Sequence, residues 1–357
     1  MKQELSPRAF LLRFVALALA LLLVGGGVMI AVDPYQHYRK SETHVLYERY
    51  SLPGMVEFSE YDAALVGSSM SQNFDMDQMD ALFSCECFKA TKGGLTPGEA
   101  AEILTWLKKE GKAKTVFLSL EITHFAGGEP EDKYFPDYLA NDSLLDDWKY
   151  LYGYEAWMRF LPLNAAFSAL DAVGKLPSSL AEKTEPDLLG SWAEDARYPG
   201  EEALVNGYLR GALGVSAQNA DGMLSRMKEN FDAWLAAEPF DPETEYVYFS
   251  APYSALYWTH TMREGTLDAI LQFRTYFFSR LAEYENVKVF DFQGIEEITD
   301  LDLYKDISHY HPDVNAYMLT LLSEEKHLAI PEEVEANNAF IRASVASLCE
   351  RYPDLKK

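Results

Sequence analysis

Two short groups of residues in this sequence have the types and spacing that acyl-transfer chemistry requires. The first is Gly67-Ser68-Ser69, which directly follows an apolar segment. A serine in such a strand-to-helix turn exposes its hydroxyl and can point its own N–H at a developing oxyanion. The second is Asp306-Ile307-Ser308-His309, in which the carboxylate can hold one ring nitrogen of the histidine while the other acts as a base. Taken alone, the first group is more typical of a helix N-cap, and the second is more typical of an ordinary surface loop.

The segments that must position these residues have the pattern of a parallel β-sheet. Five short apolar segments read as strands, namely residues 62–67, 87–91, 115–120, 246–250 and 287–292. Segments with a helical pattern, such as 97–109 and 266–285, lie between them. Continuous apolar strands between helices are typical of a sheet that is covered on both faces. We therefore predict an α/β fold with three layers, α/β/α, around a central parallel sheet. Ligands bind such sheets beyond the carboxyl ends of the strands, where the Ser68-Ser69 turn lies.

In their order along the chain, the two groups resemble the motif blocks of the SGNH (GDSL) hydrolase superfamily. Gly67-Ser68-Ser69 is similar to the block usually written Gly-Asp-Ser, and Asp306-x-x-His309 is similar to the closing block. The resemblance implies Ser69 as nucleophile, His309 as base and Asp306 as the residue that orients the base. It covers about residues 60–330 and implies a flavodoxin-like sheet and chemistry without a cofactor.

The oxyanion hole of that superfamily is matched in part. Thr91-Lys92-Gly93-Gly94-Leu95-Thr96 resembles the block whose glycine N–H lines the hole, and Gly94 fits it best. The third block, usually Gly-x-Asn-Asp, reads Glu121-Ile122-Thr123-His124 here, so its asparagine is missing. Thr123 lies at roughly that position, and Asn73 is a second candidate donor beside the Ser69 N–H. Since losing one donor costs roughly 10²–10³ in rate, we expect weak hydrolysis.

Ser68 replaces the usual aspartate of the first block. The same substitution occurs in membrane-anchored acyl-transfer relatives such as the D-alanyl transfer protein of teichoic-acid modification. The resemblance therefore implies an exported bacterial protein, either a serine esterase or an O-acyltransferase, that acts on a cell-envelope glycan or a related surface carbohydrate. The partners it implies are a carbohydrate or acyl-ester substrate and a membrane-bound acyltransferase. The missing asparagine supports an alternative, a catalytically degenerate scaffold that binds polysaccharide or assists an export complex.

Other reactive side chains give no metal site. Glu121 with His124, and Asp306 with His311, lack ligand spacing on one element. The three cysteines form no CxxC pair, which excludes a structural zinc site; they are Cys85, Cys87 and Cys349. They fit small buried side chains, or a bridge to Cys349 in an oxidising compartment.

The N-terminal segment predicts a membrane anchor. Phe14 to Val32 is a run of 19 uncharged residues, about 28 Å of helix. Lys2, Arg8 and Arg13 precede it against one acidic residue, which favours a cytoplasmic N-terminus. A cleaved signal peptide is the alternative, but the exit sequence lacks small residues at both recognition positions. We predict an uncleaved signal-anchor, one transmembrane helix, and a main domain outside the cytoplasm.

The remaining organisation follows from composition. We predict a stub and anchor over 1–33, a connector over 34–60, an α/β domain over 61–330, and a helical tail over 331–357. An aromatic-rich helical insertion at about 128–238 interrupts the domain, either as a lid or as a satellite core.

The net charge and the aromatic residues bear on which classes of molecule this protein could bind. The formal charge of −25 over 357 residues excludes a nucleic-acid binder, because phosphate recognition needs a basic surface. Tyr253, Tyr257 and Trp258 fit either a sugar-stacking wall or core packing.

Overall fold

The computed structural model describes residues 6–40, 47–128, 134–139, 141, 143–160, 191–193, 196–212 and 219–356. By internal contacts the chain divides into two compact units. The first comprises Met1–Ser59 with Tyr134–Glu185, and the second comprises Glu60–Lys133 with Pro186–Lys357.

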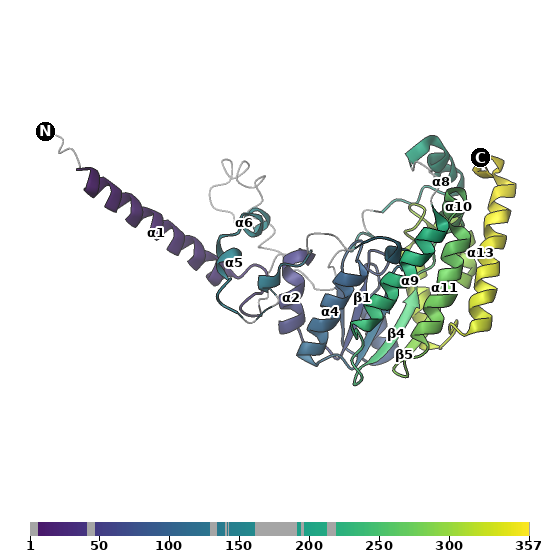
Figure 1. Cartoon of the computed structure of the whole chain (residues 1–357), viewed down its shortest axis with the longest axis horizontal. Helices are drawn as coiled ribbons and strands as arrows, with labels where there is room; N and C mark the ends of the chain where they lie inside the picture. The colour runs from purple at the N-terminus through teal and green to yellow at the C-terminus, as the bar shows by residue number, and fades with distance from the viewer. Residues whose placement is uncertain are drawn as a thin grey trace. The chain divides into compact units, whose positions relative to one another are not determined.

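The second unit is built on a sheet of five strands in the order β2-β1-β3-β4-β5, and every pair is parallel (Figure 1). The strands are β1 (Ala63–Gly67), β2 (Cys87–Thr91), β3 (Thr115–Ser119), β4 (Glu245–Ser250) and β5 (Val287–Asp291). Each coincides with a predicted apolar segment to within a residue. Nearly all their residues are buried, as expected for strands covered on both faces. The predicted α/β class and parallel sheet are confirmed.

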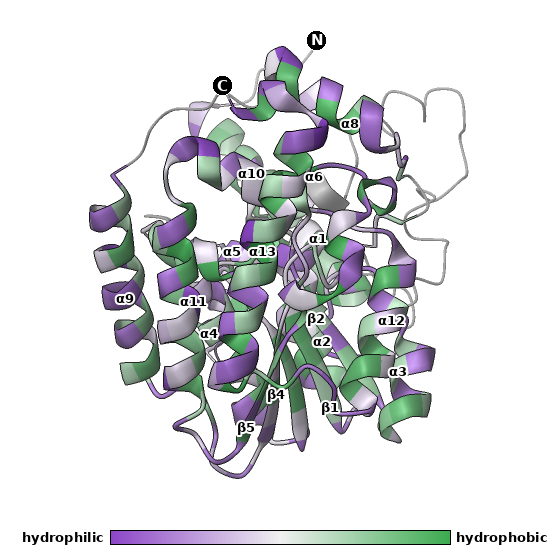
Figure 2. Ribbon diagram, turned by 90° about the vertical axis from the view of Figure 1, so that its right-hand side faces the viewer, coloured by the Kyte–Doolittle hydropathy of each residue, from purple (hydrophilic) through white to green (hydrophobic). Residues whose placement is uncertain are grey.

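Helices cover both faces of this sheet. In Figure 2, α9 and α11 lie side by side on one side of the strands, and α3 and α12 lie together on the other. The helices of the second unit are α3 (Met76–Phe83), α4 (Pro97–Glu110), α8 (Glu201–Gly207), α9 (Ala220–Ala236), α10 (Ala255–Glu264), α11 (Leu267–Leu281), α12 (Pro312–Ser323) and α13 (Pro331–Arg351). Local sequence sets their ends. Thr96 and Glu99 form a capping box at the start of α4, and Gly111 ends it in the left-handed region.

Helices are present in both of the other predicted segments, the insertion at about 128–238 between β3 and β4 and the tail at 331–357. Residues of the predicted insertion at about 128–238 belong to both units: α5 (Trp148–Tyr152) and α6 (Tyr154–Phe160) to the first, α8 and α9 to the second. The predicted tail at 331–357 contains α13, which packs on α10 and α11 and buries Val334, Ile341 and Leu348. Helical periodicity identifies an apolar face, but it does not show which surface that face meets.

The first unit contains the long N-terminal helix α1 (Pro7–Val32) and α2 (Glu48–Phe58). By length and composition, α1 is long and apolar enough to cross a membrane. The predicted connector at 34–60 contributes α2 and part of a small core. That core includes Met29, Tyr35, Tyr50, Leu139, Tyr150 and Ala156.

A buried ion pair fixes the end of β5. Asp291 accepts hydrogen bonds from Arg274 Nη2 at 2.5 Å and from Asn337 Nδ2 at 2.9 Å, while Ser250 Oγ donates to its other oxygen at 2.7 Å. The Arg274 and Asp291 side chains are 1% and 0% exposed. Since buried charges persist only when each is paired, this network joins β5, α11 and α13.

We expect Asp291→Ala to lower the free energy of unfolding by about 3–5 kcal/mol, because it leaves the Arg274 charge buried and unpaired. The matched control is Arg342→Ala, which removes an exposed ion pair between Arg342 of α13 and Asp268 of α11. That change should cost roughly 0.2–1 kcal/mol. Denaturant unfolding followed by tryptophan fluorescence measures both, and equal losses would contradict the prediction.

Candidate active site

The site begins where three neighbouring strands end at the same level. In the parallel register, Gly67 of β1 lies opposite Thr91 of β2 and Ser119 of β3. The chain leaves β1 toward β2 on one side, and β3 lies on the other side, so a topological switch point falls between β1 and β3. In sheets of this order, ligands bind in the crevice at that point.

Ser69, His309 and Asp306 are brought together at this edge. Ser69 Oγ lies 2.9 Å from His309 Nε2. His309 Nδ1 lies 2.8 Å from Asp306 Oδ2 and 3.0 Å from Oδ1. The three residues thus form a chain of hydrogen bonds in the arrangement of a nucleophile, a base and an orienting carboxylate.

Two side chains tie the Asp306–His309 loop to the serine turn, although 240 residues separate them. Tyr310 donates its hydroxyl to the Met70 carbonyl at 2.8 Å, and Asn315 Nδ2 donates to the same carbonyl at 3.2 Å. Both side chains are buried. The position of His309 is therefore fixed by the start of α12 as well as by its own loop.

The Asp306 carboxylate is held in its ionised form. Burial alone raises the pKa of Asp306, but hydrogen bonds from the His309 ring and from the His309 and Ser308 backbone N–H groups more than offset it. The pKa of Asp306 is accordingly below its usual value. An ionised carboxylate keeps the proton of His309 on Nδ1, so that Nε2 is free to accept one from Ser69.

The neighbouring serine has a different partner. Ser68 Oγ donates to Glu121 Oε1 and accepts from the Met70 N–H at 3.2 Å. Ser68 is buried, whereas Ser69 is half-buried. Ser69 is therefore the serine of this turn that faces the histidine.

Glu121, directly after β3, connects the turns at the sheet edge. Besides Ser68, it accepts from the Tyr253 hydroxyl at 2.7 Å, and it lies 3.5 Å from His124 Nε2. Burial, and then the Glu121 charge, raise the pKa of Tyr253 well above its usual value, so this hydroxyl stays a donor. The carboxylate thus joins the turns that follow β1, β3 and β4 across the switch point.

Two of the predicted oxyanion donors are backbone N–H groups. Within the described part of the chain, the N–H groups of Ser69 and Gly94 donate no hydrogen bond. Gly94 has φ +62°, a conformation that favours glycine, and its Cα faces open space. Lys92, which precedes Gly94, forms a buried ion pair at 2.8 Å with Glu99, which follows Gly94, and this pair holds the turn.

The two side-chain candidates differ. Thr123 has its hydroxyl 3.4 Å from the Tyr257 hydroxyl, which donates to it. Asn73 Oδ1 accepts from the Trp192 N–H at 3.1 Å and from Ser191 Oγ at 3.3 Å, which fixes the orientation of the amide. Its Nδ2 is shielded from solvent and, among the described residues, has no hydrogen-bond partner.

Trp192 and Lys305 contact the site and were not predicted. Trp192 Nε1 donates to the Ser69 carbonyl at 3.0 Å, and its ring meets the His309 ring edge-to-face at 5.3 Å. The Lys305 ammonium lies 4.0 Å from the centre of the Trp192 ring. No sequence signal links Trp192 to Ser69, because they are 123 residues apart and Trp192 belongs to no motif.

The aromatic residues after β4 mainly form core. Trp258 is fully buried and donates to Gln293 Oε1 at 2.9 Å, and Tyr253 is buried and stacks on Tyr257 with 4.1 Å between ring centres. The sequence left two roles open for these residues, a sugar-stacking wall and core packing. Tyr253 and Trp258 have the second role.

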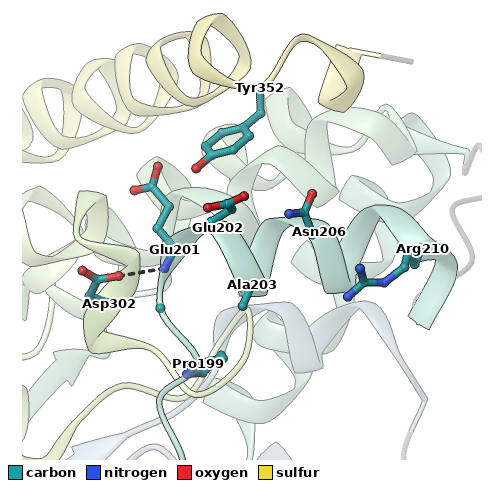
Figure 3. A pocket seen from close by; sticks show the side chains of 9 residues that line it. Pro199, Glu201, Glu202, Ala203, Asn206, Arg210, Asp302 and Tyr352 are labelled. Carbon is teal, nitrogen blue, oxygen red and sulfur yellow. Dashed lines mark hydrogen bonds between the residues drawn. The ribbon is translucent and has the colours of Figure 1, made fainter.

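A cavity of about 680 Å³ opens beside the segment that leads to Asp306 (Figure 3). Its lining includes Glu201, Asn206, Arg210 and Tyr352, and Asp302 accepts from the Glu201 N–H at 2.7 Å. None of the triad residues lines this cavity.

Comparisons of the chain with known protein families, curated proteins and solved structures found no match. In the described residues, no three histidine, cysteine, aspartate or glutamate side chains are placed to hold a metal ion. Cys85, Cys87 and Cys349 are free thiols.

We expect Ser68→Ala to slow labelling of the protein by a fluorophosphonate probe about tenfold without abolishing it. The change leaves a Glu121 oxygen without its donor and loosens the turn, and tenfold corresponds to about 1.4 kcal/mol. Ser71→Ala is the matched control, because the buried Ser71 hydroxyl has no partner among the described residues. A folded Ser68→Ala variant that resists labelling completely would make Ser68 the nucleophile instead.

Proposed function

We propose that this protein is a serine-dependent acyl-transfer enzyme, either an esterase or an O-acyltransferase. One observation carries the proposal, the unbroken hydrogen-bond chain from Ser69 Oγ through His309 to Asp306 at the carboxyl edge of the sheet. A hydroxyl paired with an imidazole whose other nitrogen is held by a carboxylate is the general arrangement of an activated serine.

The reaction proceeds in two halves. Ser69 Oγ attacks the carbonyl carbon of an acyl ester while His309 Nε2 takes its proton, and the leaving alcohol departs with that proton. A water molecule or a sugar hydroxyl then gives its proton to His309 and attacks the acyl-enzyme. Ser69 leaves as the alcohol and recovers the proton.

The tetrahedral oxyanion needs preorganised donors. The N–H groups of Ser69 and Gly94 supply two, and we propose Asn73 Nδ2 as the third, in the role of the missing asparagine. Its support is an amide oriented by Trp192 and Ser191, whose shielded nitrogen has no partner among the described residues. Such a donor becomes most favourable when an oxyanion forms beside it.

The substrate class rests on the resemblance to the SGNH superfamily and on the location it implies. We propose an acyl ester as donor, and water or a cell-envelope carbohydrate as acceptor. The N-terminal helix would hold the enzyme at the membrane, with its main domain outside the cytoplasm. There it could receive an acyl group from a membrane-bound acyltransferase.

The packing of α1 favours an anchor that is retained. Met29 is fully buried in the small core of the first unit, and the Asp33 carboxylate accepts from the backbone N–H groups of His37, Tyr38 and Arg39. Cleavage after this helix would remove Met29 from that core and leave its apolar neighbours in water.

The alternative is a non-catalytic scaffold with the same fold. The absence of an asparagine from Glu121-Ile122-Thr123-His124 is the observation that favours it. A scaffold would bind polysaccharide or assist an export complex without ever forming an acyl-enzyme.

Covalent labelling separates the two functions. We expect a fluorophosphonate to form an adduct on Ser69 that peptide mass spectrometry locates, and we expect weak hydrolysis of small acetyl esters. Ser69→Ala and His309→Ala should each remove nearly all of both signals, because nucleophile and base act as a unit. Asp306→Asn should have an equal or smaller effect, since it orients the base. A folded wild-type protein without any adduct would support the scaffold.

Asn73→Ala should lower the rate of acetyl-ester turnover by about 10²–10³. Thr123→Val is the matched comparison and should change that rate little, because the proposed third donor is the Asn73 amide and not the Thr123 hydroxyl. The measurement is kcat for both variants, with the midpoint of denaturant unfolding as a check of folding. The reverse order of effects would identify Thr123 as the donor.

A further inference from the structure

The segment 143–157 of the first unit exposes an unusual number of large apolar side chains. Eight of its residues are exposed, namely Ser143, Leu144, Leu145, Trp148, Lys149, Tyr152, Tyr154 and Glu155. Five of the eight are leucine, tryptophan or tyrosine. Leu145 is 91% exposed, Leu144 and Tyr154 are each 78% exposed, and Trp148 is 61% exposed. Clusters of exposed apolar residues on this scale mark a surface that meets something less polar than water.

This segment carries three acidic residues and one lysine, but its exposed charges are balanced, whereas the whole chain carries −25. Its two exposed charged residues are one lysine and one glutamate. Lys149 pairs with Asp146 at 3.9 Å, and Glu155 pairs with Arg49 at 3.8 Å. Asp147 is buried and accepts from the Tyr38 hydroxyl at 3.0 Å. A surface with paired charges can approach an apolar phase at low desolvation cost.

Specific contacts hold the segment against the C-terminal part of α1. The Tyr152 hydroxyl donates to the Leu22 carbonyl at 3.1 Å, and the Tyr150 hydroxyl donates to Asp33 at 2.9 Å. Gly26 permits the approach, because a Cβ atom there would lie 2.5 Å from the Tyr152 oxygen. The segment therefore lies beside the last ten or so residues of the apolar helix.

The length of α1 places this contact at a membrane boundary. Its 26 residues span about 39 Å, whereas the hydrocarbon core of a bilayer is about 30 Å thick and needs about 20 residues. A span of about 20 residues that begins at Pro7 ends at Gly26. The Tyr152 contact at Gly26 therefore lies at the end of the span, the contact at Leu22 lies about one helical turn inside it, and residues 27–32 lie in the headgroup region. Tyrosine and tryptophan concentrate in that region, because each has an apolar ring and a polar group.

We propose that Leu144, Leu145, Trp148, Tyr152 and Tyr154 form an interfacial collar that inserts into the bilayer where α1 leaves it. The occupant is the lipid, since Tyr152 of the collar donates to the carbonyl of Leu22, which, like Leu23, is an exposed apolar residue of α1. The collar gives the first unit a second membrane contact beside the helix, and it fixes how that unit is oriented on the bilayer. The inference rests on the proposed membrane-spanning role of α1.

The test uses the full-length chain in nanodiscs of phosphatidylethanolamine and phosphatidylglycerol that hold no other protein. Cys85→Ser removes the half-exposed thiol, while Cys87 and Cys349 are buried. A nitroxide is then attached to Leu145→Cys or to Tyr154→Cys, and its collisions with oxygen and with a water-soluble nickel chelate are compared. Leu17→Cys in α1 gives the lipid reference, and Glu57→Cys, exposed in the same unit, gives the aqueous reference.

We expect the oxygen-to-nickel ratio at positions 145 and 154 to be severalfold higher than at position 57 and to approach the ratio at position 17. An aqueous ratio at either collar position, with a lipid ratio at position 17, overturns the collar and leaves the anchor intact. Any partner of this face would then be a protein. An aqueous ratio at position 17 as well overturns both the collar and the anchor, while labelling of Ser69 tests the chemistry independently.

Discussion

The parallel register of β1 between β2 and β3 is the constraint on which the rest of the site depends. Because Gly67, Thr91 and Ser119 lie level with one another, the turns that follow these strands begin at the same edge of the sheet. The Glu121 carboxylate connects two of the turns at this edge by accepting hydrogen bonds from Ser68 and from Tyr253. Ser68 is thereby turned into the protein, and the next residue, Ser69, faces the crevice.

His309 reaches this crevice from a distant part of the chain, 240 residues after Ser69. Its loop is fixed by Asp306, which accepts from two backbone N–H groups, and by the pairing of Tyr310 and Asn315 with the Met70 carbonyl. Both side chains that bind Met70 are buried, so breaking these bonds would leave polar groups without partners. The distance between Ser69 and His309 is therefore set by the contacts at the start of α12 as much as by the Asp306–His309 loop itself.

The two units place their apolar residues differently. The second unit buries them in and around a sheet covered on both faces. The first unit buries a small tyrosine-rich core against Met29 and leaves leucine, tryptophan and tyrosine side chains exposed beside α1. The exposed apolar surface of the first unit is the physical basis for proposing that it belongs in the lipid interface.

The sequence by itself determined the strands, the parallel sheet and the identity of Ser69, Asp306 and His309 as residues that could meet. Apolar runs of five or six residues and local motifs are short-range properties, and parallel strands bring whatever follows them to one edge. Tertiary structure decided what depends on distant partners. It paired Ser68 with Glu121, fixed the orientation of Asn73 through Trp192, and packed α13 on α10 and α11. The sequence of a helix shows which of its faces is apolar. The surface that this face packs against depends on segments that lie far apart in the sequence.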